Sequence, residues 1–260
     1  IMTTDTFPKG ACATVVIGGK PVKIAGIAKG SGMIAPDMAT MLVYIFTDAK
    51  IDQADLQRII STQNDQTFNC ITVDSDTSTS DSLIAAATGA SGVDVTGSAD
   101  FVGAMHGVML DLAHQVVRDG EGATKFVTVD VTGAASNDDA RKVAMAIANS
   151  PLVKTAIAGE DANWGRIMDA VGYSGARIRE ELIDIYFDGV AATRSGVAVD
   201  TPVSKLRAVV KKQAFTINID LHLGEACYNV FTSDLSPEYV DFNRSEYSMW
   251  KRAQDEPVAE

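Results

Sequence analysis

The sequence predicts an α/β fold of two packed mixed β-sheets with helices outside. Short apolar or alternating runs, clearest at 41–46 and 214–223, are typical of strands. Longer segments in which apolar residues recur every three or four positions are typical of helices that pack on a sheet, and 98–119 is the strongest of them. The run at 41–46 is apolar throughout, so we expect a central strand that is buried on both faces.

Taken in order, the chain alternates between these two patterns. Near the N-terminus, two runs rich in β-branched residues, 11–17 and 21–27, flank Gly18-Gly19 and predict a β-hairpin. Residues 223–233 are interpreted as the second arm of a hairpin with 214–223. The other predicted elements are helix 51–64, strand 68–73, helix 98–119, strand 126–131, helix 136–150 and strand 182–187.

Charge and composition exclude several classes of protein. The 260 residues carry a net charge of −12 without a cluster of Lys and Arg, which argues against nucleic-acid binding. No apolar run reaches the roughly 20 residues of a membrane helix, and no signal peptide is visible, so a cytoplasmic protein is expected. The chain begins with Ile1 in mid-pattern, and we expect it to be part of a longer gene product.

Cysteine and histidine spacing predicts no metal site and no disulfide. Cys12, Cys70 and Cys227 lie far apart, with no CxxC pair and no metal-like spacing to a histidine. Small buried hydrophobic residues in a reducing compartment are the simpler interpretation. His106 and His114 fall off the apolar face of helix 98–119, so we expect both at its surface or boundary.

A candidate nucleophile lies in the segment KGSGMIAPDMATMLVYIF, residues 29–46. Lys29 precedes a flexible Gly-Ser-Gly stretch, and Pro36-Asp37 interrupts regular structure. Thr40 follows, at the start of the apolar run. A hydroxyl beside a glycine-rich loop and a lysine is a suitable nucleophile, although most threonines that begin a strand are there because a β-branched residue fits a pleated sheet.

Acidic residues in two loops have both structural and functional interpretations. Glu121 lies between two glycines just after helix 98–119, where the helix dipole disfavours negative charge, so it should need a positive partner. Residues 74–82, DSDTSTSDS, are interpreted first as a solvated turn with self-capping side chains. Their carboxylates are suitable for a cation, but nothing in the spacing fixes a ligand geometry.

Several motifs in the same order resemble those of the ornithine acetyltransferase family, the bifunctional glutamate N-acetyltransferases of arginine biosynthesis. The resemblance covers nearly all of residues 1–248. Ala162 replaces a proline of the family's DPNWGRI signature, and Ser233 replaces a cysteine. The motifs are TTDTFPK, KGSGMIAPDMATML, DSDTSTSDS, DGEGATK, GEDANWGRI and SDLSPEYV.

The resemblance implies a self-cleaving enzyme of the N-terminal-nucleophile-like type, without a cofactor or metal. The bond between Ala39 and Thr40 would be cut by the protein itself. Thr40 would then be both nucleophile and new N-terminus, with its own α-amine as general base. The residues expected at the site are Thr40 and Lys29 as catalytic groups, with Thr3, Lys29, Thr40, Glu121, Asn243 and Ser248 as substrate-binding groups.

The reaction implied is transfer of acetyl from N-acetylornithine to glutamate through an acetyl-threonine enzyme; some members of the family also use acetyl-CoA. Residues 1–39 would end an α chain, and 40–260 would form a β chain with a charged tail at 249–260. The family assembles as α2β2, and its oxyanion donors lie in a segment before residue 1. Asn163 and Arg166 are expected either to support the site or to begin a helix.

Two other functions remain open from the sequence. One is a self-cleaving aminopeptidase or amidase of related fold, in which water accepts the acyl group. The other is a non-catalytic assembly subunit, because the segment that carries the oxyanion donors is not in this sequence. Detection of acetyl transfer, of acetate release, or of neither separates the three.

Overall fold

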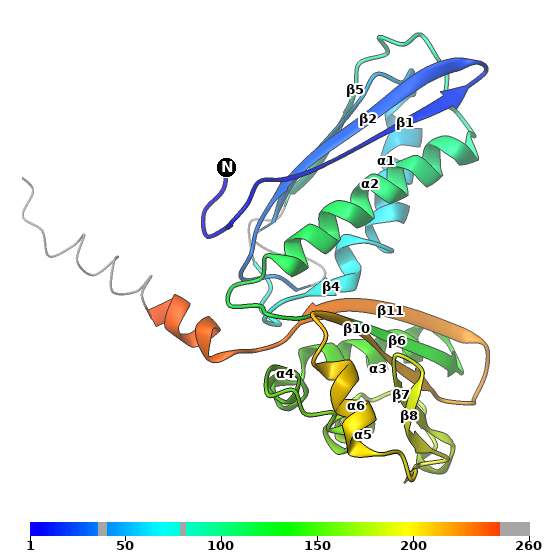
Figure 1. Ribbon diagram of the computed structural model, residues 1–260. Helices are drawn as coiled ribbons and strands as arrows, with labels where there is room; N and C mark the ends of the chain where they lie inside the picture. The colour runs from blue at the N-terminus through cyan, green and yellow to red at the C-terminus, as the bar shows by residue number, and fades with distance from the viewer. Residues whose placement is uncertain (36–40, 79–81, 245–260) are drawn as a thin grey trace, which may run out of the picture.

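The computed structural model describes residues 1–35, 41–78 and 82–244. Its strands form two mixed sheets, one of four strands and one of seven, and helices pack on both (Figure 1). The predicted α/β fold with two mixed sheets and flanking helices is confirmed. Because the hydrophobic core divides into one cluster under each sheet, each sheet is described with the helices that cover it.

The four-stranded sheet contains the predicted hairpin and has the order β1-β2-β3-β5. β1 pairs antiparallel with β2 and β2 with β3, whereas β3 and β5 are parallel. Helices α1 and α2 cover one face of this sheet. The bounds are β1 Lys9–Ile17, β2 Lys20–Lys29, β3 Leu42–Thr47, β5 Ser82–Ala87, α1 Gln53–Asn64 and α2 Ala99–Arg118.

The expectation that the run at 41–46 is buried on both faces was wrong. In β3, Val43 and Ile45 are buried against the helices, but the alternate residues point to the opposite face and Phe46 is 51% exposed. The strand is internal in its sheet, as predicted, yet helices cover only one face of that sheet. An unbroken apolar run therefore marked a central strand without burying both of its faces.

The faces of the two sheets that point away from their helices differ in polarity. On the four-stranded sheet this face carries one exposed apolar side chain from each strand: Val16, Ile27, Phe46 and Ile84 are 47–63% exposed. On the seven-stranded sheet the alternate positions of β6 and β10 are polar, among them Thr128, Asp130, Asn218 and Asp220. Only the second pattern, with polar side chains at alternate positions, is typical of a sheet face in contact with water.

The seven-stranded sheet has the order β4-β11-β6-β10-β7-β8-β9, and helices α3 to α6 contribute to the core beneath it. β6 pairs with β10 in parallel and with β11 antiparallel. The bounds are β4 Ile71–Thr72, β6 Phe126–Ala134, β7 Asp184–Phe187, β8 Val190–Arg194, β9 Val197–Ala198, β10 Ala214–Asp220, β11 Ala226–Ser233, α3 Asn137–Asn149, α4 Pro151–Ala158, α5 Trp164–Tyr173 and α6 Val203–Val210.

Three predicted elements of this half differ from the structure. The hairpin between 214–223 and 223–233 was wrong, because β6 lies between β10 and β11. Most of the strand predicted at 68–73 is a 3₁₀-helix, Phe68–Cys70, followed by the short β4, and a second 3₁₀-helix, Glu180–Leu182, precedes β7. Partner choice in a sheet depends on contacts far along the chain, which local residue patterns do not contain.

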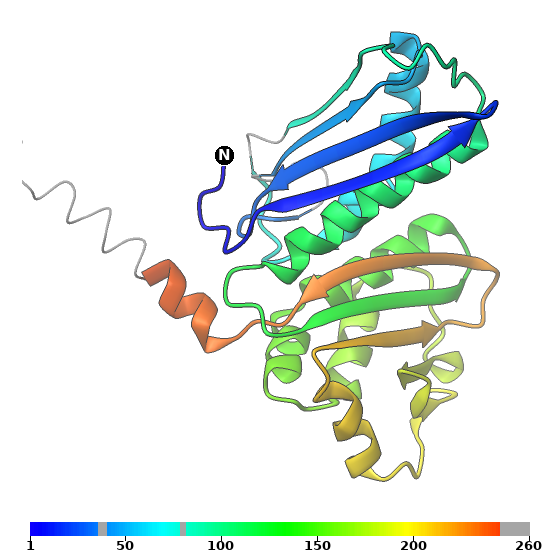
Figure 2. The ribbon, with the colours of Figure 1, turned by 45° about the horizontal axis from the view of Figure 1, so that its top comes forward.

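Helix α2 lies between the two sheets, as both views show (Figures 1 and 2). Its residue His114 reaches the seven-stranded sheet, where its ring lies edge-on to Phe126 and Phe231 at centroid distances of 5.1 and 4.3 Å. His114 therefore lies at a boundary, as expected, but at the boundary between two cores. In the three described ranges no helix has both the length and the apolar composition of a membrane span.

Candidate active site

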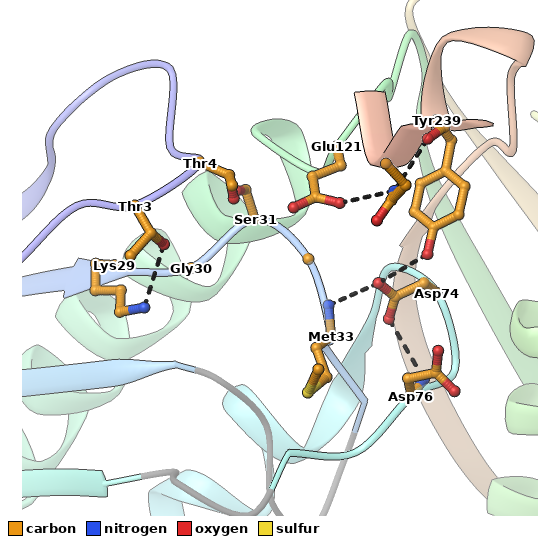
Figure 3. Close-up of a pocket in the computed structure, with 12 residues that line it drawn as sticks. Thr3, Thr4, Lys29, Gly30, Ser31, Met33, Asp74, Asp76, Glu121 and Tyr239 are labelled. Carbon is orange, nitrogen blue, oxygen red and sulfur yellow. Dashed lines mark hydrogen bonds between the residues drawn. The ribbon is translucent and has the colours of Figure 1, made fainter. Parts of the chain in front are cut away.

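A pocket of about 250 Å³ lies where the end of β2, the end of α2 and the segment after β11 meet (Figure 3). Four residues predicted to bind substrate, Thr3, Lys29, Glu121 and Asn243, line it from four separate parts of the chain. The other predicted site residues, Ala39, Thr40 and Ser248, lie outside the described residues. The remaining lining residues are Thr4, Gly30, Ser31, Gly32, Met33, Asp74, Asp76 and Tyr239.

Lys29 is the last residue of β2 and is only 6% exposed, although it lines the pocket. Its ammonium Nζ donates a hydrogen bond to Thr3 Oγ1 at 3.4 Å (Figure 3). The sheet register pairs Lys29 with Leu42, where β3 begins. The two strands therefore bring the start of β3 to the same edge of the sheet as the Lys29 side chain.

A buried ion triad holds the N-terminal segment against the end of α2. Lys9 Nζ lies 2.5 Å from Asp5 Oδ1 and 2.5 Å from Asp119 Oδ2, and all three side chains are at most 1% exposed. Asp119, which ends α2, also accepts a hydrogen bond from the Thr6 amide at 3.0 Å. The Lys9 cation offsets the unfavourable position of the Asp119 carboxylate at a helix C-terminus.

Asp5 connects this triad to the pocket. Its carboxylate accepts hydrogen bonds from the Gly30 amide at 2.7 Å and from the Thr3 amide at 3.1 Å. Burial by itself would raise the pKa of Asp5, but the hydrogen bonds from Lys9, Gly30 and Thr3 lower it below its ordinary value. Asp5 therefore fixes Thr3 and the residue after Lys29 with one charged group.

Glu121 lies in the turn after α2, directly against the glycine-rich loop that follows β2. Its amide donates to Ser31 O at 2.8 Å, and its Oε2 accepts a hydrogen bond from Asn243 Nδ2 at 3.1 Å. A Cβ added at Gly32 would overlap the Glu121 carboxylate in its present position, so a larger residue there would displace that carboxylate. The absence of a side chain at Gly32 thus permits close packing beside a charged pocket residue.

Asp74 gives structural meaning to a loop that the sequence favoured as a solvated turn. Its carboxylate accepts hydrogen bonds from the Met33 and Ile34 amides at 2.6 and 3.0 Å, and from the Tyr239 hydroxyl at 3.4 Å. Burial, followed by the nearby carboxylates of Asp74 and Glu121, raises the pKa of Tyr239 to about 12. The phenol is therefore a neutral hydrogen-bond donor at the pocket wall.

The pocket combines one cation with several anions. Lys29 contributes the positive charge, and Asp74, Asp76 and Glu121 contribute carboxylates. A small ligand that carries both an amino group and a carboxylate complements this arrangement, because each charge meets an opposite one. Among the described residues no group of three or more His, Cys, Asp and Glu side chains is arranged to hold a metal ion.

Other candidate residues have structural positions away from the pocket. Asn163 caps α5 by accepting the Arg166 amide, and Arg166 Nη1 donates to Leu152 O at 2.7 Å, so this pair joins α4 to α5. Of the two interpretations of these residues, the structure supports a helix start. His106 bonds to Gln63, at 2.9 Å, between α2 and α1.

No individual role was predicted for Asp5, Lys9, Asp119 or Tyr239, and Asp74 was considered only as one of the carboxylates in the 74–82 loop. Asp5 and Lys9 are four residues apart, and Asp119 is the first residue of the DGEG turn, but only the fold brings the three together. Tyr239 belongs to the SDLSPEYV motif, and this membership was its sole indication of a functional position. Motif membership without a partner does not predict a side-chain contact.

Comparison with known proteins places the chain in a family. Residues 1–248 match the family model described as ArgJ family. The chain is 60% identical to the arginine biosynthesis bifunctional protein ArgJ of Ruegeria pomeroyi over 94% of its length and 60% of that protein, and 54% identical to the Caulobacter vibrioides protein of the same name, over 94% of its length and 62% of that protein. It therefore spans about three fifths of these relatives.

A crystal structure with a similar fold supports this assignment. The arginine biosynthesis bifunctional protein argJ from Bacillus halodurans has 39% sequence identity and a TM-score of 0.75, and the match covers 78% of this chain and 98% of that one. Sequence and fold therefore agree over most of the chain. The chain belongs to the ArgJ family.

Proposed function

We propose that this chain carries the nucleophile and substrate pocket of an acetyltransferase that moves acetyl from N-acetylornithine to glutamate in arginine biosynthesis. The observation that carries the proposal is the convergence of Thr3, Lys29, Glu121 and Asn243 on one pocket of about 250 Å³. Membership of the ArgJ family and the printed names of the relatives support it. The word "bifunctional" in those names supports a second donor, acetyl-CoA.

In the proposed maturation, Thr40 Oγ attacks the Ala39 carbonyl carbon. The amide bond between Ala39 and Thr40 breaks as an ester forms, and water hydrolyses the ester to a carboxylate on Ala39 and a free hydroxyl and α-amine on Thr40. Leu42, the register partner of Lys29, is two residues from Thr40 in the sequence. Because Thr40 is so close to Leu42 in the sequence, the proposed nucleophile belongs near the end of the strand pair that carries Lys29.

In the proposed transfer, the Thr40 α-amine takes the hydroxyl proton while Thr40 Oγ attacks the acetyl carbonyl of N-acetylornithine. Ornithine leaves with that proton on its amine, and the amine of glutamate then attacks the acetyl-threonine ester. Both steps pass through a tetrahedral oxyanion, for which each hydrogen-bond donor contributes about 3–4 kcal/mol.

The pocket charges give each described residue a role in this reaction. The Lys29 ammonium, held beside Thr3 Oγ1, pairs with the substrate carboxylate. The Glu121 carboxylate pairs with the substrate amino group, and the Asn243 amide holds Glu121 in place at 3.1 Å. Ser248 is proposed as a further carboxylate-binding group. No cofactor or metal is needed in this mechanism.

The proposed active form consists of processed chains, of which residues 1–39 and 40–260 belong to different polypeptides in an α2β2 assembly, with 249–260 as a tail. The two proposed chains contact each other directly. Lys9 of residues 1–39 forms an ion pair with Asp119 of residues 40–260, and β2 of the first chain pairs with β3 of the second. These contacts support a pair of chains that stays together after cleavage. We place the enzyme in the cytoplasm.

A denaturing mass spectrum combined with an acetyl-transfer assay tests the proposal. The unprocessed chain has a mass of 27.5 kDa, and cleavage before Thr40 replaces it with two fragments. Thr40→Ala should stay intact and transfer no acetyl from N-acetylornithine to labelled glutamate, whereas Thr14→Ala, on the far face of β1, should cleave and react normally. Transfer by Thr40→Ala would refute the nucleophile, and release of acetate without transfer would identify a hydrolase instead.

A further inference from the structure

Lys154, in helix α4, is a buried lysine outside the pocket lining. Its side chain is 2% exposed, and Nζ donates hydrogen bonds to Thr232 Oγ1 at 2.8 Å and to the backbone oxygen of Ser233. Within the described ranges no carboxylate lies within ion-pair distance of it. A buried ammonium loses several kcal/mol of hydration free energy, so a lysine bonded only to neutral oxygens requires an explanation.

Two carboxylates that lie further away act electrostatically on the Lys154 charge. They are Asp234, the residue after Ser233, and Asp74, in the loop after β4. Asp234 is itself only 3% exposed. Lys154 is therefore a shared counter-charge for two anions from different elements, and its hydrogen bonds to the end of β11 fix its position beside Asp234.

Each of these carboxylates holds one loop of the pocket. Asp234 accepts hydrogen bonds from the Thr124 amide at 2.8 Å and from the Lys125 amide at 2.9 Å, at the end of the turn that contains Glu121. Asp74 accepts the Met33 and Ile34 amides at 2.6 and 3.0 Å, at the end of the glycine-rich loop that follows Lys29. The two loops meet in the contact between Glu121 N and Ser31 O, at 2.8 Å.

We propose that Lys154 is a positioning residue of the candidate active site, which sets the relative placement of the 31–34 loop and the 121–125 turn through Asp74 and Asp234. Loss of its charge leaves the two carboxylates without this counter-charge, and both weaken as anchors for the amides that they hold. Glu121 then shifts relative to Lys29. The placement of the loops follows from the contacts alone; the effect on acetyl transfer rests on the proposed function.

The protonation of Lys154 gives this arrangement a pH dependence. Burial lowers the pKa of Lys154 to about 7, and the charges of Asp234 and Asp74 oppose that shift. These two carboxylates are the charged groups that act on Nζ from the packed elements; Thr232 and Ser233 contribute neutral oxygens. The loops should therefore be held more firmly below pH 7 than above it.

The first experiment compares amide hydrogen exchange in Lys154→Met with that in Lys142→Met, a surface variant whose lysine pairs with Asp138. In Lys154→Met we expect the amides of Met33, Ile34, Thr124 and Lys125 to lose protection by about tenfold or more, while central β6 and β10 keep theirs, because the opening is local. Lys142→Met should change none of them. Equal loss at all sites, or none at these four amides, would overturn the proposal.

A second measurement needs no variant and decides the matter if Lys154→Met does not fold. In the unaltered chain, the amide shifts of the same four residues are followed by NMR between pH 6 and pH 8, together with the Lys154 Cε shift. All should share one midpoint near the pKa of about 7. Amides that do not titrate together with Lys154 would contradict a positioning role.

A kinetic readout separates this inference from the proposed function. In preparations that transfer acetyl, Lys154→Met should raise KM for N-acetylornithine by more than it lowers kcat, and Lys154→Arg, which keeps the charge, should restore part of the loss. If no acetyl transfer is found in any preparation, the proposed function fails. The exchange and NMR results still test whether Lys154 positions the two loops. An unchanged KM in Lys154→Met, with full amide protection of both loops, would refute the positioning role without affecting the proposed function.

Discussion

Lys9 Nζ lies 2.5 Å from Asp119 Oδ2, so a residue of the first strand and a residue at the end of α2, 110 positions apart, are joined in a fully buried ion pair. Asp5 completes the triad and extends it to the amides of Thr3 and Gly30. The pocket is thereby built on charged contacts between distant segments. Removal of single charges should reveal how much the site depends on them.

Lys9→Met should destabilise the chain strongly, because it leaves the Asp5 and Asp119 carboxylates buried without their cation. Removal of one partner from a buried charge group typically costs about 3–5 kcal/mol. Urea unfolding measures the change. The matched control is Lys50→Met, whose pair with Asp94 is exposed and spans 3.7 Å, so its unfolding midpoint should not move. Equal midpoints for the two variants would show that the triad contributes little.

Gly32→Ala should weaken ligand binding more than it weakens the fold. The new Cβ overlaps the Glu121 carboxylate, which must move away from Asn243 and from the pocket. We expect at least a tenfold loss of affinity for ornithine by calorimetry. Gly107→Ala, where an added Cβ meets nothing within 4 Å, is the control and should bind normally. Unaltered binding by Gly32→Ala would remove Glu121 from the ligand site.

His114 should make the chain less stable at mildly acid pH. Burial, with the nearby Arg118 charge, lowers the pKa of His114 to about 4 in the folded chain, whereas an unfolded histidine titrates at about 6.5. Between these values the unfolded state binds more protons, so stability that is complete above pH 6.5 declines as pH falls toward 4. The unfolding midpoint at pH 7.5 and at pH 5 measures this loss.

The comparison variant for that measurement is His114→Leu. Since His114 Nε2 is buried without a hydrogen-bond partner among the described residues, the replacement sacrifices no bond there. His114→Leu should show a smaller difference between the two pH values than the unaltered chain. A difference of the same size in both proteins would assign the acid sensitivity to other groups.

Ser233→Ala should stabilise the chain. The Ser233 hydroxyl is buried and has no hydrogen-bond partner within the described ranges, while its backbone oxygen, which accepts from Lys154, is unaffected by the change. A buried polar group without a partner typically costs about 1–3 kcal/mol, so the variant should unfold at higher urea concentration. Ser233→Cys, the residue that the family has in its similar segment, should behave likewise, because a buried thiol resembles a small apolar group.

The control for this pair is Ser236→Ala, three residues on. Its hydroxyl donates to Gly122 O at 2.6 Å, so its loss should destabilise the chain by about 1 kcal/mol. Opposite signs at Ser233 and Ser236 are the expected result. A lower unfolding midpoint for Ser233→Ala would mean that its hydroxyl has a favourable contact after all.

The sequence predicted the classes of element well where the pattern is local. The 3.6-residue period of α2 and the Gly-Gly turn between β1 and β2 are local patterns. Both the helix and the hairpin formed within two residues of the expected bounds. The place of β6 between β10 and β11, by contrast, is decided by pairing over about 100 residues. No local pattern specifies such a pairing, which is why the hairpin was wrong.

The candidate site, too, contains residues that the sequence predicted and residues that it did not. Motifs with a family resemblance supplied Thr3, Lys29, Glu121 and Asn243, and the structure places all four on one pocket, while their chemical roles stay predictions. The charges that hold the pocket together, Lys9 above all, were not predicted. Their importance comes from burial beside partners in other segments, and burial of a charged side chain is the property that a sequence pattern predicts least.

The apolar face of the four-stranded sheet has a practical consequence. Phe46 and Ile84, 51% and 52% exposed, lie on neighbouring strands of a face that also carries the exposed side chains of Val16 and Ile27. Large exposed apolar patches promote association between molecules and adsorption to surfaces. We therefore expect the yield and the apparent size of the purified chain to change with its concentration until that face is shielded, which a dilution series measures.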